Sequence, residues 1–128
     1  MTRMVTISSL LSILLFAFHW VDELARGLET GGVSALGGVL ILVVWLYGTL
    51  VLAERRSGYI ITLLGGLFSL VVPIAHMMGK GVGVGSRIAK SSGHFFFVWT
   101  MIAIGVTGLF SVILSARGLW SLKWGQAR

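Results

Sequence analysis

The stretch MVTISSLLSILLFAFHWVDEL, residues 4–24, decides the class of this chain. A run of about twenty mostly apolar residues is long enough to cross roughly 30 Å of hydrocarbon as an α-helix. Three further runs of the same kind occupy residues 33–53, 59–79 and 94–116. The sequence therefore predicts an all-α integral membrane protein, an antiparallel bundle of four transmembrane helices with short loops.

The composition agrees with this interpretation over the whole chain. Hydrophobic residues make up 56% of the 128 residues and charged residues only 11%, and the mean hydropathy is +0.97. A soluble domain needs far less apolar surface. Because the four runs leave little sequence over, we expect one membrane domain over residues 1–128. Although Arg3 precedes the first run, no small-residue cleavage site follows it, so we interpret the run as a helix of the mature protein.

The basic residues predict the orientation of the bundle. With four spans both termini share a side, and six of the ten Lys and Arg residues fall there: Arg3, Arg55, Arg56, Arg117, Lys123 and Arg128. The positive-inside rule then places both termini in the cytoplasm. The net charge of +6 is explained by this topology and by anionic lipid, so we predict no nucleic-acid partner.

The connections between the runs are short. The segment ERRSG (54–58) allows only a tight turn, which makes the second and third helices antiparallel neighbours, and we expect Gly58 to supply a positive φ there. The third connection, GKGVGVGSRIAKSSG (79–93), is the longest and reads as a flexible basic loop. The tail RGLWSLKWGQAR (117–128) pairs Trp120 and Trp124 with cations, a pattern typical of a short interfacial helix or frayed end.

Small residues recur along the fourth helix. Every fourth position from 103 to 115 carries one, namely Ala103, Thr107, Ser111 and Ser115. Such a stripe lets two helices approach closely in lipid. It predicts packing either within the bundle or against a second copy of the chain.

The three histidines all fall at the helix ends that should share the outer side. His19 and Glu23 are four residues apart and so project from one face of the first helix. His76 follows Pro73, which should kink the third helix and turn the imidazole inward, while His94 opens the fourth helix. We therefore expect a cluster at the extracytoplasmic end, formed by His19, Glu23, His76 and His94.

Two kinds of ligand suit this set of side chains. Imidazoles with a carboxylate are ligands for Zn²⁺ or Cu²⁺, and Met77, Met78 and Met101 could serve the softer Cu⁺. Haem needs only two facing histidines from different helices, drawn from His19, His76 and His94. The chain has no cysteine, so thiolate ligands and cysteine catalysis are excluded.

Other functions remain as alternatives at this stage. The polar residues could dock a non-catalytic accessory subunit onto a larger membrane complex, or several copies could form a small oligomeric transporter. A small multidrug exporter is disfavoured. Exporters of that kind carry their defining acidic residue in the middle of the first helix, whereas Asp22 and Glu23 of this chain lie at the end of its first helix. Hydrolase and transferase motifs are absent, which favours binding of an ion or cofactor over enzymatic catalysis.

Overall fold

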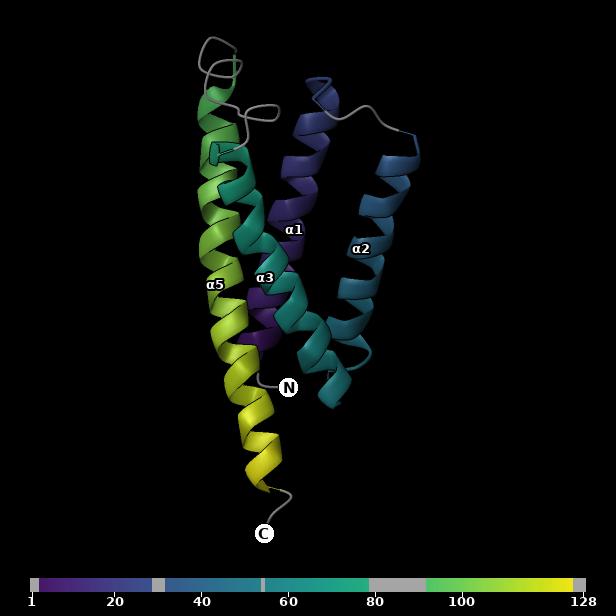
Figure 1. Ribbon diagram of the computed structural model, residues 1–128, viewed down its shortest axis with the longest axis vertical. Helices are drawn as coiled ribbons and strands as arrows, with labels where there is room; N and C mark the ends of the chain where they lie inside the picture. The colour runs from purple at the N-terminus through teal and green to yellow at the C-terminus, as the bar shows by residue number, and fades with distance from the viewer. Residues whose placement is uncertain (1–2, 29–31, 54, 79–91, 126–128) are drawn as a thin grey trace.

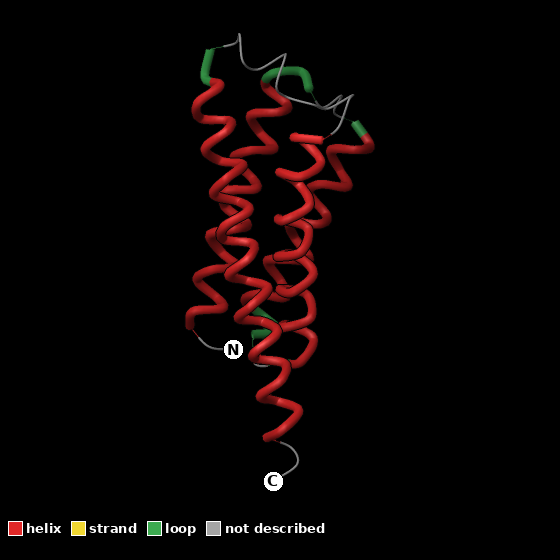
Figure 2. The backbone as a smooth tube through the Cα atoms, turned by 60° about the vertical axis from the view of Figure 1, so that its left-hand side comes forward, coloured by secondary structure: helices red, strands yellow, loops and turns green. Residues whose placement is uncertain are grey.

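The computed structural model describes residues 3–28, 32–53, 55–78 and 92–125. Four helices fill these ranges, namely α1 (Arg3–Ala25), α2 (Val33–Leu50), α3 (Arg56–Met78) and α5 (His94–Gly125), and no strand occurs in them. The helices run up and down side by side, with the start of α1 and the end of α5 at the same end of the bundle (Figures 1 and 2). The predicted all-helical class is confirmed. The loop expected at 79–93 lies outside the described residues except for its last two.

Three of the helices are long and apolar enough to cross a membrane. These are α1, α3 over Arg56–His76 and α5 over His94–Lys123, whereas α2 offers the shorter apolar segment Ala35–Leu50. The predicted span 33–53 is therefore too long. The amides of Val51 and Leu52 both donate to the carbonyl of Tyr47, at 2.8 and 3.2 Å. This doubled bond ends α2, and the chain then turns toward α3.

The α2–α3 turn confirms the predicted neighbours but corrects the role of Gly58. Positive φ values occur at Gly27, Gly32 and Gly93, and Gly58 does not share them. Gly58 instead lies in the first turn of α3, where a Cβ atom would overlap the carbonyl oxygen of Leu52. A side chain is excluded there by close approach and not by backbone conformation.

The C-terminal tail is also corrected. Instead of ending at residue 116, α5 continues without interruption to Gly125. Its 32 residues correspond to about 48 Å at roughly 1.5 Å per residue. Gly118 is buried against the ring of Tyr59 in α3, where any side chain would collide. This contact holds the start of the tail against α3. Residues 117–125 therefore continue the last helix instead of forming a separate short helix or a frayed end, and residues 126–128 lie outside the described part of the chain.

The most extensive contact in the bundle joins α3 to α5. The two backbones approach closely at Gly66 and Gly108, where a Cβ on either residue would lie 2.9 Å from the carbonyl oxygen of the other. Ser111 and Ser115, from the small-residue stripe, are fully buried in the bundle, whereas Ala103 and Thr107 are only partly buried. Ser111 and Ser115 therefore serve packing within the chain.

Serine hydroxyls link α1 to α5 and to α2. Toward α5, the hydroxyl of Ser8 donates to the carbonyl of Thr107 at 3.1 Å and lies 2.9 Å from that of Ser111. Toward α2, the Trp45 indole donates to Ser9 at 2.9 Å, and the Ser9 and Thr49 hydroxyls are 2.7 Å apart. Because the buried side chains of Ser8, Ser9, Trp45 and Thr49 all have partners, these contacts stabilise the middle of the bundle.

Candidate metal centre

Ionisable side chains gather at the end of the bundle where α1 and α3 end and α5 begins. His19 and Glu23 lie one turn apart near the end of α1, and His76 comes from the last turn of α3. The structure brings these three residues together, and we call them the His/Glu cluster. One ligand atom from each, an imidazole nitrogen or a carboxylate oxygen, lies within 4.8 Å of the other two.

His76 is held by hydrogen bonds at both ring nitrogens. Its Nδ1 lies 2.7 Å from the carbonyl oxygen of Val72, one turn earlier in α3. A carbonyl can only accept, so Nδ1 must carry the proton and donate it. The opposite nitrogen, Nε2, contacts the Oε1 atom of Glu23. An ionised carboxylate also only accepts, so a hydrogen bond at Nε2 places a proton on this nitrogen too. When that proton is absent, Nε2 offers its lone pair to a metal ion.

His19 is the most deeply buried member of the cluster. Its side chain is 1% exposed, against 12% for Glu23 and 12% for His76. The Nε2 atom of His19 lies 3.6 Å from Oε1 of Glu23 and has no hydrogen-bond partner. Leaving a buried polar atom unpaired costs roughly 1–3 kcal/mol. The unpartnered Nε2 of His19, which faces the Glu23 carboxylate, is therefore the atom of the cluster whose burial a bound ion would offset most.

The aromatic ring of Phe97 packs against one side of the cluster. Phe97 in α5 is fully buried, and its ring centroid lies 4.5 Å from that of His19 and 6.1 Å from that of His76. The two imidazole rings are themselves edge to face, 5.2 Å apart. The ring of Phe97 excludes water from this side, and low polarity strengthens any charge interaction inside the cluster.

Asp22 lies next to the cluster in sequence but takes no part in it. Its carboxylate accepts a hydrogen bond from Nε of Arg26 at 2.8 Å. The same guanidinium donates from Nη1 to the carbonyl of Ser92 at 3.1 Å and lies 5.8 Å from the centroid of Phe97. Arg26 thus ties the end of α1 to the start of α5 beside the cluster. It also neutralises the second carboxylate, so the single negative charge in the cluster belongs to Glu23.

His94 does not join the other predicted ligands. It is the first residue of α5 and its side chain is exposed. Of the three methionines named as softer ligands, Met101 is buried beside Phe97 in a small apolar core, and the side chains of Met77 and Met78 lie outside the described residues. The described donor set consists of two nitrogens and one carboxylate.

The sequence did not single out Phe97, Thr100 or Arg26. The first two face the cluster because the buried side of α5 repeats at helical spacing. This side is made of Phe97, Thr100, Met101, Ile104, Gly108, Ser111, Ser115 and Gly118. That periodicity can be read from the sequence once the start of the helix is known. Arg26 could be expected to pair with Asp22, four residues before it.

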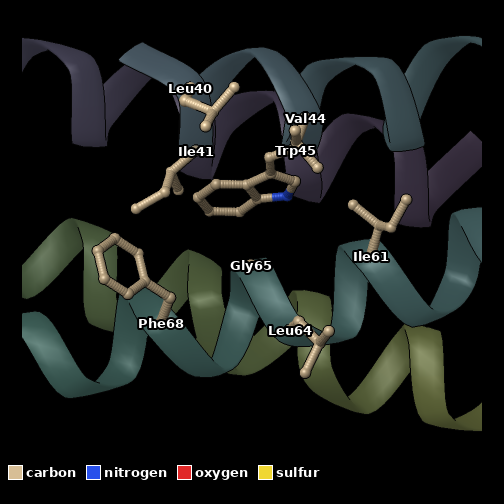
Figure 3. A pocket seen from close by; sticks show the side chains of 8 residues that line it. All are labelled: Leu40, Ile41, Val44, Trp45, Ile61, Leu64, Gly65 and Phe68. Carbon is tan, nitrogen blue, oxygen red and sulfur yellow. The ribbon is translucent and has the colours of Figure 1, made fainter. Parts of the chain in front are cut away.

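A concave groove lies between α2 and α3. Its volume is about 370 Å³, and Figure 3 shows the indole of Trp45 facing Gly65 across it. The lining is apolar throughout, being formed by Leu40, Ile41, Val44, Trp45, Ile61, Leu64, Gly65 and Phe68. The one polar atom of that lining, the indole nitrogen, already donates to Ser9. The groove offers volume but no reactive or ligating group.

No known protein family matches this chain, and it matches neither a curated protein nor a solved structure. Function therefore has to be inferred from the geometry of the His/Glu cluster.

Proposed function

We propose that this chain is a small polytopic membrane protein whose His/Glu cluster binds one divalent transition-metal ion, Zn²⁺ or Cu²⁺. The observation that carries the proposal is the buried, unpartnered Nε2 of His19, which faces the same carboxylate oxygen that contacts Nε2 of His76. An ion placed among these atoms would give His19 its missing partner.

The donor set supports a borderline divalent ion. Imidazole nitrogen and carboxylate oxygen suit Zn²⁺ and Cu²⁺, whereas Cu⁺ prefers sulfur. Ligands that are about 2.0–2.1 Å from a tetrahedral ion lie roughly 3.3–3.4 Å from each other. The 3.6 Å between His19 and Glu23 is close to that spacing. The contact between Nε2 of His76 and Oε1 of Glu23 is shorter than that spacing, so these two side chains must separate for an ion to enter between them.

The bond from His76 to Val72 adds independent support. Histidines that bind metals almost always donate their second nitrogen to a carbonyl, a carboxylate or water, which fixes the ring and its tautomer. The 2.7 Å contact from Nδ1 of His76 to the Val72 carbonyl matches this arrangement. It leaves Nε2 as the ligand atom.

The same geometry favours an ion over haem. Haem with two histidine ligands needs an imidazole on each side of a flat macrocycle. Here the rings of His19 and His76 are edge to face at 5.2 Å, and the carboxylate of Glu23 approaches both of them. This spacing suits a single ion and not a porphyrin.

The alternative functions receive less support from these residues. A docking surface needs accessible side chains, but the side chain of His19 is buried. A transporter built from several copies would need the small-residue stripe of α5 on an outer face, but Ser111 and Ser115 are buried between helices of one chain. We therefore retain neither as the leading function.

Three protein ligands leave one position of a tetrahedral ion for water or another small ligand, a feature of exchangeable and catalytic zinc sites. This count covers the described part of the chain. We infer that the ion exchanges with solution from the extracytoplasmic side, because the basic residues favour cytoplasmic termini and the cluster lies at the opposite end of the bundle. The absence of native cysteine makes the side directly testable: a Ser121→Cys variant should react with an impermeant maleimide only in inside-out vesicles.

Equilibrium dialysis of the detergent-solubilised chain against Zn²⁺ or Cu²⁺ tests the proposal. We expect one ion per chain, and we expect Glu23→Gln to lose it because the variant keeps the shape of the side chain but removes its charge. Asp22→Asn is the matched control, since Asp22 pairs with Arg26 outside the cluster, and it should bind normally. Equal binding by wild type and Glu23→Gln would refute the assignment.

A further inference from the structure

Helix α5 contributes no ligand to the His/Glu cluster, yet it contacts the ligand that is most deeply buried. The Oγ1 atom of Thr100 lies 3.5 Å from Nδ1 of His19, and the side chains of both residues are buried. This is a long hydrogen bond, so it adds little stability by itself. Its importance lies in which ring nitrogen it leaves with the proton.

The other contacts of Thr100 determine the direction of this bond. The hydroxyl donates to the carbonyl oxygens of Phe96 and Phe97, at 3.0 and 2.9 Å. A threonine hydroxyl has one hydrogen and two lone pairs, so once that hydrogen is directed to its own helix, only a lone pair can face His19. Nδ1 of His19 must then be the protonated nitrogen, and the unprotonated Nε2 faces Glu23.

We propose that Thr100 is a positioning residue of the metal site, which holds His19 in the tautomer and orientation that present its Nε2 lone pair to the ion. This inference rests on the proposed function. It assigns to α5 a role that none of the three ligands reveals, because the site is complete only when α1, α3 and α5 pack together.

Phe97 assists by limiting how the His19 ring can turn. Its fully buried ring lies 4.5 Å from the imidazole, so rotation of His19 would require the aromatic side chain to move. The two histidines are then held in equivalent ways. Val72 accepts from Nδ1 of His76 through a main-chain carbonyl, and Thr100 accepts from Nδ1 of His19 through a side chain, which can be changed by mutation.

Thr100→Val removes the hydroxyl while keeping the branched shape of the side chain. Because loss of an outer-shell partner costs about 10–100-fold in metal affinity, we expect the Kd for Zn²⁺ to rise by that factor. Thr100→Ser, which keeps the hydroxyl, should restore binding. Thr107→Val is the matched control, since the Thr107 hydroxyl donates to carbonyls of the same helix and has no histidine beside it.

A spectroscopic measurement separates positioning from general damage to the fold. Imidazole ¹⁵N chemical shifts distinguish a nitrogen that carries a proton from one that does not. In the metal-free wild type at alkaline pH, the His19 signal, identified by its loss in His19→Phe, should be that of the Nδ1–H tautomer. Thr100→Val should shift it toward the Nε2–H form, and Thr107→Val should leave it unchanged.

The outcomes distinguish the two proposals. Failure of the wild type to bind either Zn²⁺ or Cu²⁺ overturns the proposed function. A His19 tautomer that is the same in wild type and Thr100→Val overturns the positioning role, whether or not zinc binds. Normal zinc affinity in Thr100→Val overturns it as well.

Discussion

Buried polar groups occur both in the middle of this bundle and at its His/Glu end, and the two regions differ in whether these groups have hydrogen-bond partners. In the middle, the hydroxyl of Ser9 meets both the Trp45 indole and Thr49, and Ser8 meets Ser111. At the His/Glu end, Nε2 of His19 faces a carboxylate oxygen at 3.6 Å without a hydrogen-bond partner. Paired polar groups stabilise a fold, whereas an unpaired buried atom among converging ligands indicates a binding site.

Three hydroxyls elsewhere in the bundle also lack partners, those of Thr62, Ser69 and Ser115. They do not weaken the contrast. A serine or threonine hydroxyl on a helix can rotate to bond the carbonyl four residues earlier. The Nε2 atom of His19 cannot rotate to a carbonyl of its own helix in this way. The oxygen that it faces at 3.6 Å, Oε1 of Glu23, already contacts Nε2 of His76.

The largest effect should come from replacing the unpaired atom itself. His19→Phe removes a ligand, so the affinity for Zn²⁺ should fall by more than the roughly 10–100-fold that loss of an outer-shell partner costs. The metal-free protein should at the same time unfold no more easily than wild type, since an apolar ring replaces an unsatisfied polar one. Titration with Zn²⁺ and unfolding in mixed detergent measure the two quantities. His94→Phe, at the exposed histidine outside the cluster, should leave the affinity for Zn²⁺ unchanged.

Metal should stabilise the wild type by mass action. At a free Zn²⁺ concentration 100 times the Kd, the free energy of unfolding should rise by about 2.7 kcal/mol. The same addition should leave His19→Phe unchanged, because the ion then has no site in the folded state. Equal stabilisation of both proteins would mean that zinc acts elsewhere on the chain.

In the middle of the bundle, close packing should dominate the response. A Cβ at Gly108 would lie 2.6 Å from that of Ser69 and 2.9 Å from the Gly66 carbonyl, so Gly108→Ala should lower the free energy of unfolding by about 1–3 kcal/mol. Gly37→Ala is the matched control, because no atom lies within 4 Å of its added methyl group. We expect that variant to gain up to about 1 kcal/mol from helix propensity. Equal effects of the two variants would argue against the α3–α5 contact.

The smallest effect belongs to the paired hydroxyls. Ser9→Ala leaves the Trp45 indole and the Thr49 hydroxyl with one partner fewer, and hydrogen bonds between membrane helices contribute about 0.6–2 kcal/mol. Unfolding should therefore become easier by that amount while the zinc affinity stays the same. Ser121→Ala, whose hydroxyl bonds only within α5, should have no effect. A loss of zinc binding in Ser9→Ala would remove the distinction between the two regions.

Much of this arrangement could be predicted from the sequence, because apolar runs of membrane length determine helices directly. The start of α5 at His94 and the α2–α3 hairpin were predicted correctly. The end of α2, the role of Gly58 and the uninterrupted tail were not. The end of α2 depends on two amides that share the Tyr47 carbonyl, and the role of Gly58 on its close approach to the Leu52 carbonyl. The tail packs through the contact of Gly118 with Tyr59. None of these contacts can be read from an apolar run.

Part of the candidate site could also be predicted from the sequence, and part could not. Helical spacing places His19 and Glu23 on one face of α1. The third apolar run, which includes Pro73, places His76 near the end of α3. The separation of His94 from the cluster depends on how far α5 overlaps the ends of α1 and α3. The role of Thr100 depends on the rotation of α5 about its axis, so neither could be derived without the packed bundle.

X-ray absorption at the zinc K edge of the one-to-one complex tests the central claim most directly. We predict a first shell of nitrogen and oxygen at about 2.0–2.1 Å, with the outer-shell scattering of two imidazoles in the wild type and of one in His76→Ala. A shell of oxygen alone, or an imidazole count that stays the same when His76 is removed, would contradict the assignment of His19, Glu23 and His76 as the ligands.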